Sequence, residues 1–322
     1  MPLFFPSVPP FCAMSTVALT TILAAIHTAE SPVPERPTNP AAGKAAAAPA
    51  REASTSPTPY TIERLHSTIL GEERAALIRL PRHYVRDTSA RYPVLFKLDG
   101  GNGLERYDAA IDILSCAGAM PDLIVVAIPN ARGQRDRDMT PARLHQDFDV
   151  TGKMGTGEVG HGDRFLEFLE QELIPQIEQR YRTASPRILA GHSRSALLVL
   201  ESLLSKPELF DARFIFSAPL LRDERRMLVD TRAFLAAHSE HRSFIYFNWG
   251  ESENEGMGQS YDAMRELLRE AAPPGLRWTV ARARHADHQQ TPLTALPEAL
   301  LDYFSPDRTS RTVSTEQIPG RN

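Results

Sequence analysis

A serine stands at a tight turn in the segment RILAGHSRSALLVL, between an apolar strand-like run and an apolar helical run. Gly191-His192-Ser193 matches the start of the G-x-S-x-G elbow, a strained strand-to-helix turn that exposes a nucleophilic serine. The last glycine of that pattern is Ser195 here, but Gly191, Ser195 and Ala196 are all small enough for a sharp turn. We interpret Ser193 as a nucleophile, with an ordinary serine at a helix start as the alternative. His192 is expected to point away from Ser193 and to pack under the turn.

A base and an acid follow this serine in the order that such hydrolases use. A serine hydroxyl attacks only when a base removes its proton, and an acid must orient that base. His285 and His288 follow the last strand-like segment, and their spacing does not choose between them. Three glutamates, Glu251, Glu253 and Glu255, follow the preceding strand-like segment. The sequence therefore offers a serine, an acid and a histidine, with the acid and the histidine still open.

An oxyanion hole needs two backbone N–H groups that face the developing negative charge. The amide of Arg194, directly after the serine, is one candidate. The second is expected from the loop after VLFKLDG, where Gly100, Gly101 and Asn102 allow close backbone approach, and we choose Gly101. The histidines and acidic residues show no H-E-x-x-H or C-x-x-C spacing, and the glycine-rich GTGEVGHG has no G-K-[ST] after it. We therefore expect no metal and no cofactor.

Segments typical of strands alternate with segments typical of helices along residues 60–305. The strand-like segments are TIERLHSTIL, ALIRLP, YPVLFKLD, DLIVVAIPN, RILAG, RFIFSAP, SFIYFNWG and LRWTVARA. The expected helices cover residues 106–117, 163–180, 196–204, 260–271 and 292–304. Pro175 should kink the second of these or end a first helix. This alternation predicts an α/β fold with a mainly parallel, doubly wound sheet and an antiparallel N-terminal hairpin, which fits the α/β-hydrolase fold.

Bulk properties set limits on the partners of the 322-residue chain. The net charge of -4 provides no basic field for nucleic acid, so no such partner is expected. The chain has two cysteines, Cys12 near the start and Cys116 in an expected helix, so no disulfide is predicted within the folded part. Cys116 is interpreted as a small buried side chain.

The ends of the chain differ in composition from its middle. Residues 1–30 contain MSTVALTTILAAIHTA, an apolar run of signal-peptide length that is too short to span a membrane, although no Lys or Arg precedes Arg36. We interpret it as a leader for a periplasmic or secreted protein, with a cytoplasmic tail as the alternative. Residues 31–59 are rich in Pro and Ala and predict a disordered linker, and residues 306–322 predict a flexible tail. One domain is expected over residues 60–305.

Two longer segments make the chain similar to a known family. RDRDMTP resembles an R-x-R-D-x-T-P signature at Arg135, Arg137, Asp138, Thr140 and Pro141, and FLEFLEQELIPQIEQRYRT resembles the long helix before the elbow strand. Together with the opening hairpin and the loop of RYPVLFKLDGGNGLERY, they resemble the esterases related to esterase D and to the enterobactin-type trilactone esterases of siderophore metabolism. The resemblance covers roughly residues 60–305 and implies a carboxylic-ester hydrolase of α/β-hydrolase fold.

The resemblance also chooses among the open candidates. The family's base precedes a Ser/Thr-x-Pro-like segment that opens the final helix, and HQQTPLTALPEALLDYF places His288 there. The family's G-x-x-E stretch implies that Glu253 is the acid, with Glu251 in reserve, although some members work with a serine–histidine dyad. The family's double glycine after the serine is Ser195-Ala196 in this chain. Arg194 also places a cation where many relatives have an apolar residue.

The resemblance implies hydrolysis of siderophore-type or other small esters, in which Ser193 attacks and His288 moves the proton. Arg135 and Arg137 are expected to line the mouth and to favour anionic substrates such as ferric catecholates. The alternative for both arginines is a structural salt bridge with Asp136 or Asp138. Two other functions stay open, an acyltransferase on the same scaffold and a catalytically impaired binding protein.

Overall fold

The computed structural model describes residues 60–101, 103–144 and 160–305. The expected domain over residues 60–305 comprises these ranges together with residues 102 and 145–159, which are not described. The predicted leader, linker and tail, and Asn102, lie outside the described residues. In the described ranges, no helix combines the length and the apolar character that crossing a membrane requires.

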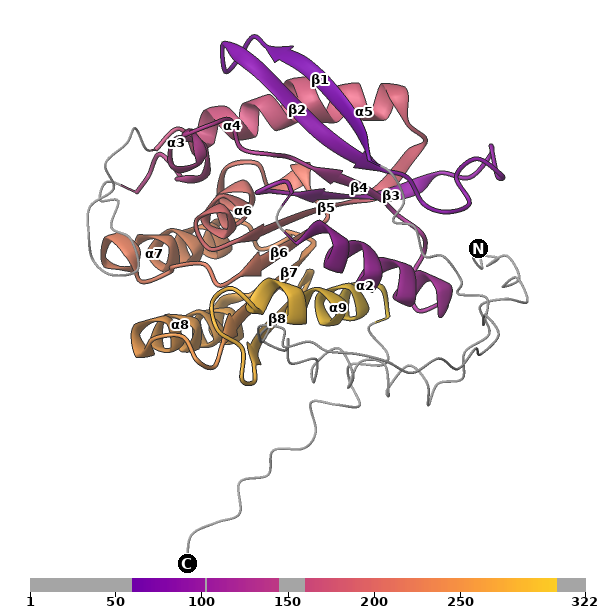
Figure 1. Ribbon diagram of the computed structural model, residues 1–322. Helices are drawn as coiled ribbons and strands as arrows, with labels where there is room; N and C mark the ends of the chain where they lie inside the picture. Colours follow the sequence, from indigo (N-terminus) through magenta and orange to yellow (C-terminus); the bar gives the residue numbers. More distant parts are fainter. Residues whose placement is uncertain (1–59, 102, 145–159, 306–322) are drawn as a thin grey trace, which may run out of the picture.

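A single eight-stranded sheet forms the centre of the molecule, with the strand order β1-β2-β4-β3-β5-β6-β7-β8 (Figure 1). Its strands are β1 (Thr61–Ser67), β2 (Glu72–Arg79), β3 (Tyr92–Lys97), β4 (Ile124–Ala127), β5 (Thr183–His192), β6 (Ala212–Phe216), β7 (Ser243–Gly250) and β8 (Leu276–Ala283). β1 and β2 are antiparallel, β2 joins β4 antiparallel, and the pairs from β4 through β8 are parallel. The predicted mainly parallel sheet with an antiparallel hairpin is confirmed.

The burial of each strand follows its sequence pattern. β4 is entirely apolar, and β3 and β6 are apolar apart from Lys97 and Arg213; every residue in the three strands is buried because helices cover both faces of the sheet. β1 lies at the sheet edge, and exposed residues recur along it. The parallel strands end at one common edge of the sheet, so the loops after β3, β5, β6, β7 and β8 come together there.

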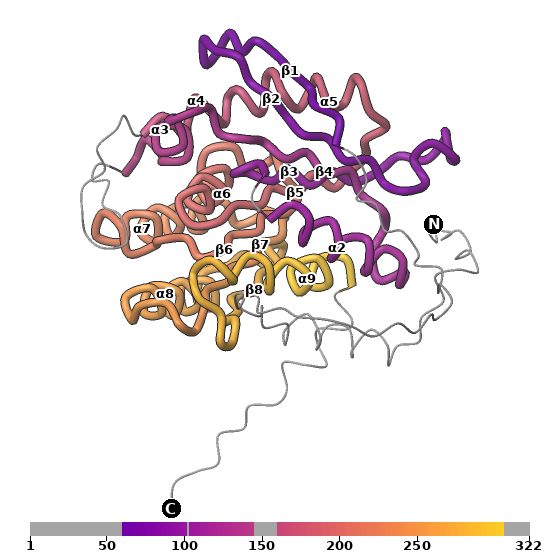
Figure 2. Tube along the Cα trace, viewed as in Figure 1, coloured from indigo at the N-terminus to yellow at the C-terminus, as the bar shows by residue number. Residues whose placement is uncertain are grey.

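Helices cover the two faces of the sheet (Figures 1 and 2). The helices are α2 (Leu104–Cys116), α3 (Arg135–Met139), α4 (Gly162–Phe168), α5 (Ile174–Arg180), α6 (Arg194–Ser205), α7 (Arg222–Ala237), α8 (Glu255–Ala271) and α9 (Thr291–Phe304). α2 and α9 share one apolar core with one face of the sheet. The other face packs against α4, α5, α6, α7 and α8 in a second core. This division confirms the doubly wound arrangement.

The long helix predicted over residues 163–180 is interrupted, as Pro175 requires. A π-helical turn (Leu169–Leu173) separates α4 from α5, and Pro175 lies in the first turn of α5. Proline lacks an N–H and its ring clashes with the preceding turn, which a widened turn relieves. Glu172 in the π-helical turn accepts hydrogen bonds from the amides of Thr68 and Ile69, at 2.9 and 3.2 Å. This carboxylate attaches the turn between β1 and β2 to the helical layer.

Two helices were missing from the sequence prediction, the short α3 and the longer α7. α7 is strongly polar, and its buried face rests on a few side chains such as Met227 and Phe234. Residues 223–225 also have left-handed backbone angles at its start, so no regular capping pattern marks the beginning of the helix. The other predicted helices are confirmed, with starts that lie up to five residues earlier than expected. Cys116 is half-buried on α2 rather than fully buried.

Candidate active site

Ser193 occupies the sharp turn between β5 and α6. Its backbone has φ 59° and ψ -124°, a region that residues other than glycine rarely adopt. A hydrogen bond of 2.9 Å from its amide to the Phe216 carbonyl holds this geometry. A Cβ atom on Gly191 would lie 2.7 Å from the Ser195 carbonyl oxygen and 2.8 Å from Val199 Cγ2, so this position requires glycine. The turn has the geometry that the sequence predicts for a nucleophile elbow.

A chain of two hydrogen bonds links Ser193 to a histidine and a glutamate. His288 Nε2 lies 2.9 Å from Ser193 Oγ, and His288 Nδ1 lies 2.8 Å from Glu253 Oε2. With Nδ1–H donating to the carboxylate, Nε2 is the acceptor for the serine hydroxyl. The other candidates lie elsewhere, since the His285 side chain is 93% exposed and faces Glu251 instead. The fold therefore brings together Ser193, Glu253 and His288.

Glu253 is held at the end of β7 by groups from several elements. Its Oε1 accepts hydrogen bonds of 2.7 Å from the Ser217 hydroxyl and from the Gly250 amide. Burial alone would raise the pKa of the Glu253 carboxyl, but hydrogen bonds from His288, Ser217 and Gly250 outweigh burial and lower it. Glu253 is thus maintained as a carboxylate that faces the histidine.

Ser217 was not identified from the sequence. It stands directly after β6, whose end lies between the serine strand and the acid strand in the sheet. Its backbone φ is 47°, and its amide donates to the Asn248 carbonyl. A small polar residue at the end of a central parallel strand is the signal that could have indicated it, because the ends of neighbouring strands converge.

His192 supports the base rather than packing only under the turn. Its ring lies 4.6 Å from the His288 ring between centroids, and its Nε2–H donates to the His288 carbonyl at 2.6 Å. Burial, followed by the charge of the neighbouring His288, lowers the pKa of His192 to about 4. A neutral imidazole therefore fixes the loop that carries His288.

Arg194 begins α6, and its amide lies directly after the serine. Its side chain is only 8% exposed and turns to α3, where it pairs with Asp136 at 3.0 Å and donates to Thr140 at 2.9 Å. The cation that the sequence places beside the oxyanion hole is therefore neutralised. The N-terminal end of α6 also favours negative charge at this edge of the sheet.

The loop after β3 (residues 98–101), called the oxyanion loop here because the sequence predicts that role, contacts the elbow through Asp99, which is hydrogen-bonded to Ser195. The Gly100 amide donates to the Ile128 carbonyl, whereas Gly101 is exposed at the end of the loop. A Cβ atom on Gly100 would lie 2.4 Å from Pro129 Cα, so the loop can adopt this path only with glycine there. Gly101 thus stands at an exposed point of a tightly packed loop.

Asp99 in the oxyanion loop was not identified from the sequence. Its buried carboxylate accepts hydrogen bonds from Arg135 at 2.7 and 2.8 Å, from Asn130 at 2.7 Å and from the Ser195 hydroxyl at 2.7 Å. Burial alone would raise the pKa of Asp99, but Arg135 and the two other donors lower it. Arg135 also donates to the His192 carbonyl. Asp99 therefore connects three segments around the elbow.

The two arginines of RDRDMTP face different parts of the molecule. Arg135 binds Asp99, not Asp136 or Asp138 as the salt-bridge alternative assumed. Arg137 binds Asp138 at 2.8 Å, as that alternative expected, and also Glu72 at 2.6 Å.

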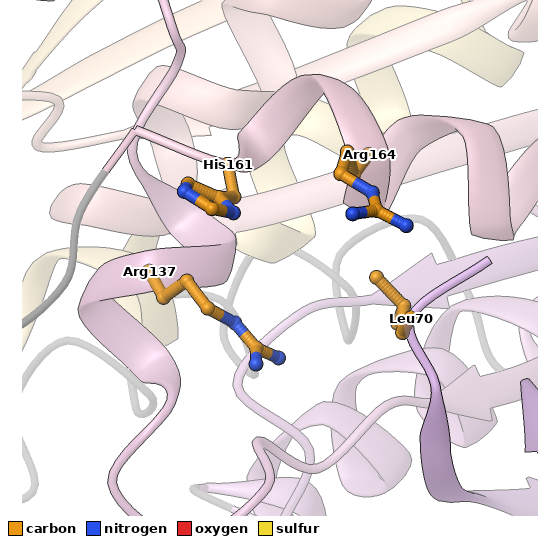
Figure 3. A pocket seen from close by; sticks show the side chains of 4 residues that line it. All are labelled: Leu70, Arg137, His161 and Arg164. Carbon is orange, nitrogen blue, oxygen red and sulfur yellow. The ribbon is translucent and has the colours of Figure 1, made fainter.

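Arg137 lines a hollow of about 170 Å³ between the hairpin turn and the starts of α3 and α4. Its other lining residues are Leu70, His161 and Arg164 (Figure 3). Within the described ranges, no three His, Cys, Asp or Glu side chains gather to hold a metal ion.

Comparisons with known proteins identify related esterases. The model of the esterase family ("Putative esterase") matches residues 67–297. The chain is 25% identical over 198 residues to the ferri-bacillibactin esterase BesA of Bacillus subtilis, a match that covers 57% of this chain and 68% of BesA.

A second relative is the siderophore triacetylfusarinine C esterase of Aspergillus fumigatus, which is 30% identical over 114 residues. That match covers 33% of this chain and 39% of the relative, well under half of its length. The solved structure of an IroE-like serine hydrolase from Shewanella oneidensis superimposes with a TM-score of 0.65 and 26% identity, over 76% of this chain and 80% of that one. The overlap confirms the predicted α/β-hydrolase fold.

Proposed function

Because the chain belongs to the esterase family and is a carboxylic ester hydrolase, we propose that Ser193, His288 and Glu253 cleave its ester substrate. The observation that carries this proposal is the continuous hydrogen-bond chain of 2.9 and 2.8 Å from the serine through the histidine to the glutamate. Each distance is within the reach that proton transfer between a nucleophile and its base requires.

The proposed reaction has two halves. Ser193 Oγ attacks the ester carbonyl while His288 Nε2 takes its proton, and Glu253 stabilises the resulting imidazolium. The tetrahedral intermediate collapses, the carbon–oxygen bond to the alcohol breaks, and His288 returns the proton to the leaving alkoxide. A water molecule then repeats the sequence on the acyl-enzyme, releasing the acid and restoring Ser193.

The oxyanion of each intermediate is proposed to accept hydrogen bonds from the amides of Arg194 and Gly101. Two arrangements support this assignment. The Arg194 amide belongs to the N-terminal turn of α6, where the helix dipole favours negative charge. The Gly100 amide already donates to Ile128, so the neighbouring Gly101 is the candidate in the oxyanion loop.

The proposed substrates are small siderophore-type esters. BesA and the Aspergillus relative are named for the siderophores that they cleave, and both share the family to which this chain belongs. A role of Arg135 and Arg137 in binding anionic substrates remains a prediction. Both side chains are occupied by carboxylates of the protein itself, which favours a structural role for them.

Burst kinetics with p-nitrophenyl acetate test the nucleophile. The parent protein should release a burst of nitrophenol equal to the enzyme concentration, and Ser193→Ala should lose the burst and at least about 10⁴-fold in kcat/KM. Ser205→Ala, at the other end of α6, is the matched control and should keep both. A burst that persists in Ser193→Ala would place the nucleophile elsewhere, and a parent protein that hydrolyses no ester would contradict the proposed function.

A second assay separates the two possible acyl acceptors and the substrate classes. A cyclic catecholate trilactone and simple acetate esters should both be offered, with an added alcohol such as glycerol. Formation of free acid as the main product supports the hydrolase. Predominant transfer of the acyl group to the alcohol would instead establish an acyltransferase.

A further inference from the structure

Ser195 stands where the G-x-S-x-G pattern has its last glycine, and its hydroxyl has specific partners. The residue is fully buried in the first turn of α6. Its Oγ accepts a hydrogen bond of 2.9 Å from the His192 amide and lies 2.7 Å from Asp99 Oδ2. The His192 carbonyl lies 2.9 Å from the same oxygen, but the single hydroxyl proton is bound more strongly by the charged carboxylate. Glycine could make none of these contacts.

The other end of this hydrogen bond is firmly held. Asp99 receives two hydrogen bonds from Arg135 and one from Asn130, so its carboxylate has little freedom to move. The buried Lys97 holds the backbone of the same loop, since its Nζ donates to the carbonyls of Leu98 at 3.3 Å and Gly100 at 3.0 Å. A hydrogen bond from Ser195 therefore connects the elbow to a rigid oxyanion loop, not to a mobile side chain.

We propose that the Ser195–Asp99 hydrogen bond is a positioning bridge that fixes the oxyanion loop relative to the nucleophile elbow. This inference rests on the proposed function, in which the amides of Arg194 and Gly101 stabilise the oxyanion. Those amides come from two segments far apart in the sequence, and transition-state stabilisation requires both within about 3 Å of one oxygen atom. A direct bond between the two segments keeps that spacing. Ser195 and Asp99 touch no reacting atom, so their role is positioning.

Removing the bridge should slow the chemical steps without weakening substrate binding. Ser195→Ala and Ser195→Gly should lower kcat for p-nitrophenyl acetate about 10- to 100-fold, the cost of a small displacement of catalytic groups, and change KM less than about threefold. A trifluoromethyl ketone, whose serine adduct carries an anionic oxygen, should lose affinity in proportion to kcat/KM across the series. A residue that only stabilises the fold would not produce that correlation.

Ser202→Ala is the matched control on the same helix. Ser202 is fully buried, and its hydroxyl accepts a hydrogen bond of 2.9 Å from Arg213, on a strand rather than on the oxyanion loop. This variant should lose thermal stability and keep the parent kcat. A Ser195→Ala protein with the parent kcat and inhibitor affinity would overturn the bridge. The bridge would also be overturned if the loss of activity in Ser195→Ala were fully explained by the fraction of unfolded protein.

Asp99→Asn tests the same bond from its other end if Ser195→Ala does not fold. Asp99 has φ 57°, a conformation that asparagine also tolerates. Its kcat should fall at least as far as in Ser195→Ala, because the change also removes the charge that Arg135 pairs with. The double variant should be no slower than the slower single variant, because the bridge is lost only once. Additive losses would overturn the proposal. Ser193→Ala separates failure of the bridge proposal from failure of the proposed function. Activity in that variant would refute the proposed nucleophile and leave the bridge without its premise.

Discussion

The two sides of Ser193 are held by different kinds of interactions. On the acid–base side, Glu253 is bound by a neutral hydroxyl, a backbone amide and the histidine itself. On the oxyanion side, the buried carboxylate of Asp99 is bound by the Arg135 guanidinium, with the Lys97 ammonium holding the same loop. Among the described residues, Glu253 is held without Lys or Arg, whereas Asp99 and its loop are held by two cations in addition to the neutral donors Asn130 and Ser195.

The chemistry on each side accounts for this difference. In the proposed mechanism, Glu253 must keep its negative charge for the imidazolium that forms on His288, and a cation beside it would compete for that charge. Asp99 lies in the loop that is proposed to stabilise the oxyanion, and an uncompensated carboxylate there would repel that negative charge. Arg135 cancels that repulsion and fixes the loop at the same time. We therefore expect a charge change at Glu253 to lower mainly kcat. A charge change at Arg135 should lower both kcat and the free energy of unfolding.

Of the changes to the two sides of Ser193, Glu253→Gln is expected to have the largest effect. The amide keeps the shape of the side chain but cannot stabilise an imidazolium, so kcat should fall about 10³- to 10⁴-fold. Glu251→Gln is the matched control, because Glu251 lies on the same loop and pairs with Arg282 instead of His288. Steady-state kinetics with p-nitrophenyl acetate measure both. A larger loss in Glu251→Gln than in Glu253→Gln would reverse the assignment, and small losses in both would indicate a serine–histidine dyad.

A smaller effect is expected from Arg135→Met on the oxyanion side. The change leaves Asp99 charged and poorly compensated, and should lower kcat about tenfold and the free energy of unfolding by about 1–3 kcal/mol, given the partial exposure of Arg135. Arg137→Met should lower stability similarly, because Arg137 binds Glu72 and Asp138, but should leave kcat unchanged. Denaturant unfolding and kinetics on both variants test the comparison. Equal losses of activity, or a rise in KM for anionic esters alone, would favour substrate binding by these arginines.

The smallest effect concerns pH and His192. Because burial lowers its pKa to about 4 from an ordinary value of 6.5, the unfolded chain binds its proton first as pH falls. The contribution of neutral His192 to the free energy of unfolding is therefore complete above pH 6.5 and is lost as pH falls toward 4. The loss is at most about 3 kcal/mol, and it is smaller than this because the side chain is partly exposed. Thermal unfolding of His192→Gln should show a shallower dependence over this range. Parallel curves for parent and variant would rule out His192 as the source.

Sequence patterns predicted the sheet, most helices and the positions of the candidate catalytic groups, because these depend on local periodicity and chain order. Apolar runs such as RFIFSAP and SFIYFNWG mark buried strands, and the small residues around Ser193 mark a sharp turn. The choice of His288 over His285 did not come from spacing. It came from resemblance to a family, and the structure then placed only His288 beside the serine.

The contacts that hold the site could not be read from local patterns. Asp99 and Ser195 are 96 residues apart, and Ser217 and Glu253 are 36 apart, so nothing in either local sequence indicates the partner. Side-chain pairing across strands depends on how the sheet is assembled, which periodicity does not specify. Ser195 is an example of what local patterns miss. From the sequence it was interpreted as a small substitute for glycine, whereas in the structure its hydroxyl connects the elbow to the oxyanion loop.

The contact between Glu172 and the β1–β2 turn has a consequence for synthesis of the chain. Glu172 lies 104 residues after Thr68, whose amide it binds, so the hairpin can form early but cannot be attached to the body until the long interrupted helix has left the ribosome. β4, the strand that pairs with β2, also emerges only after a delay. During that interval the nascent hairpin exposes the open edges of its strands, where another chain could pair with it.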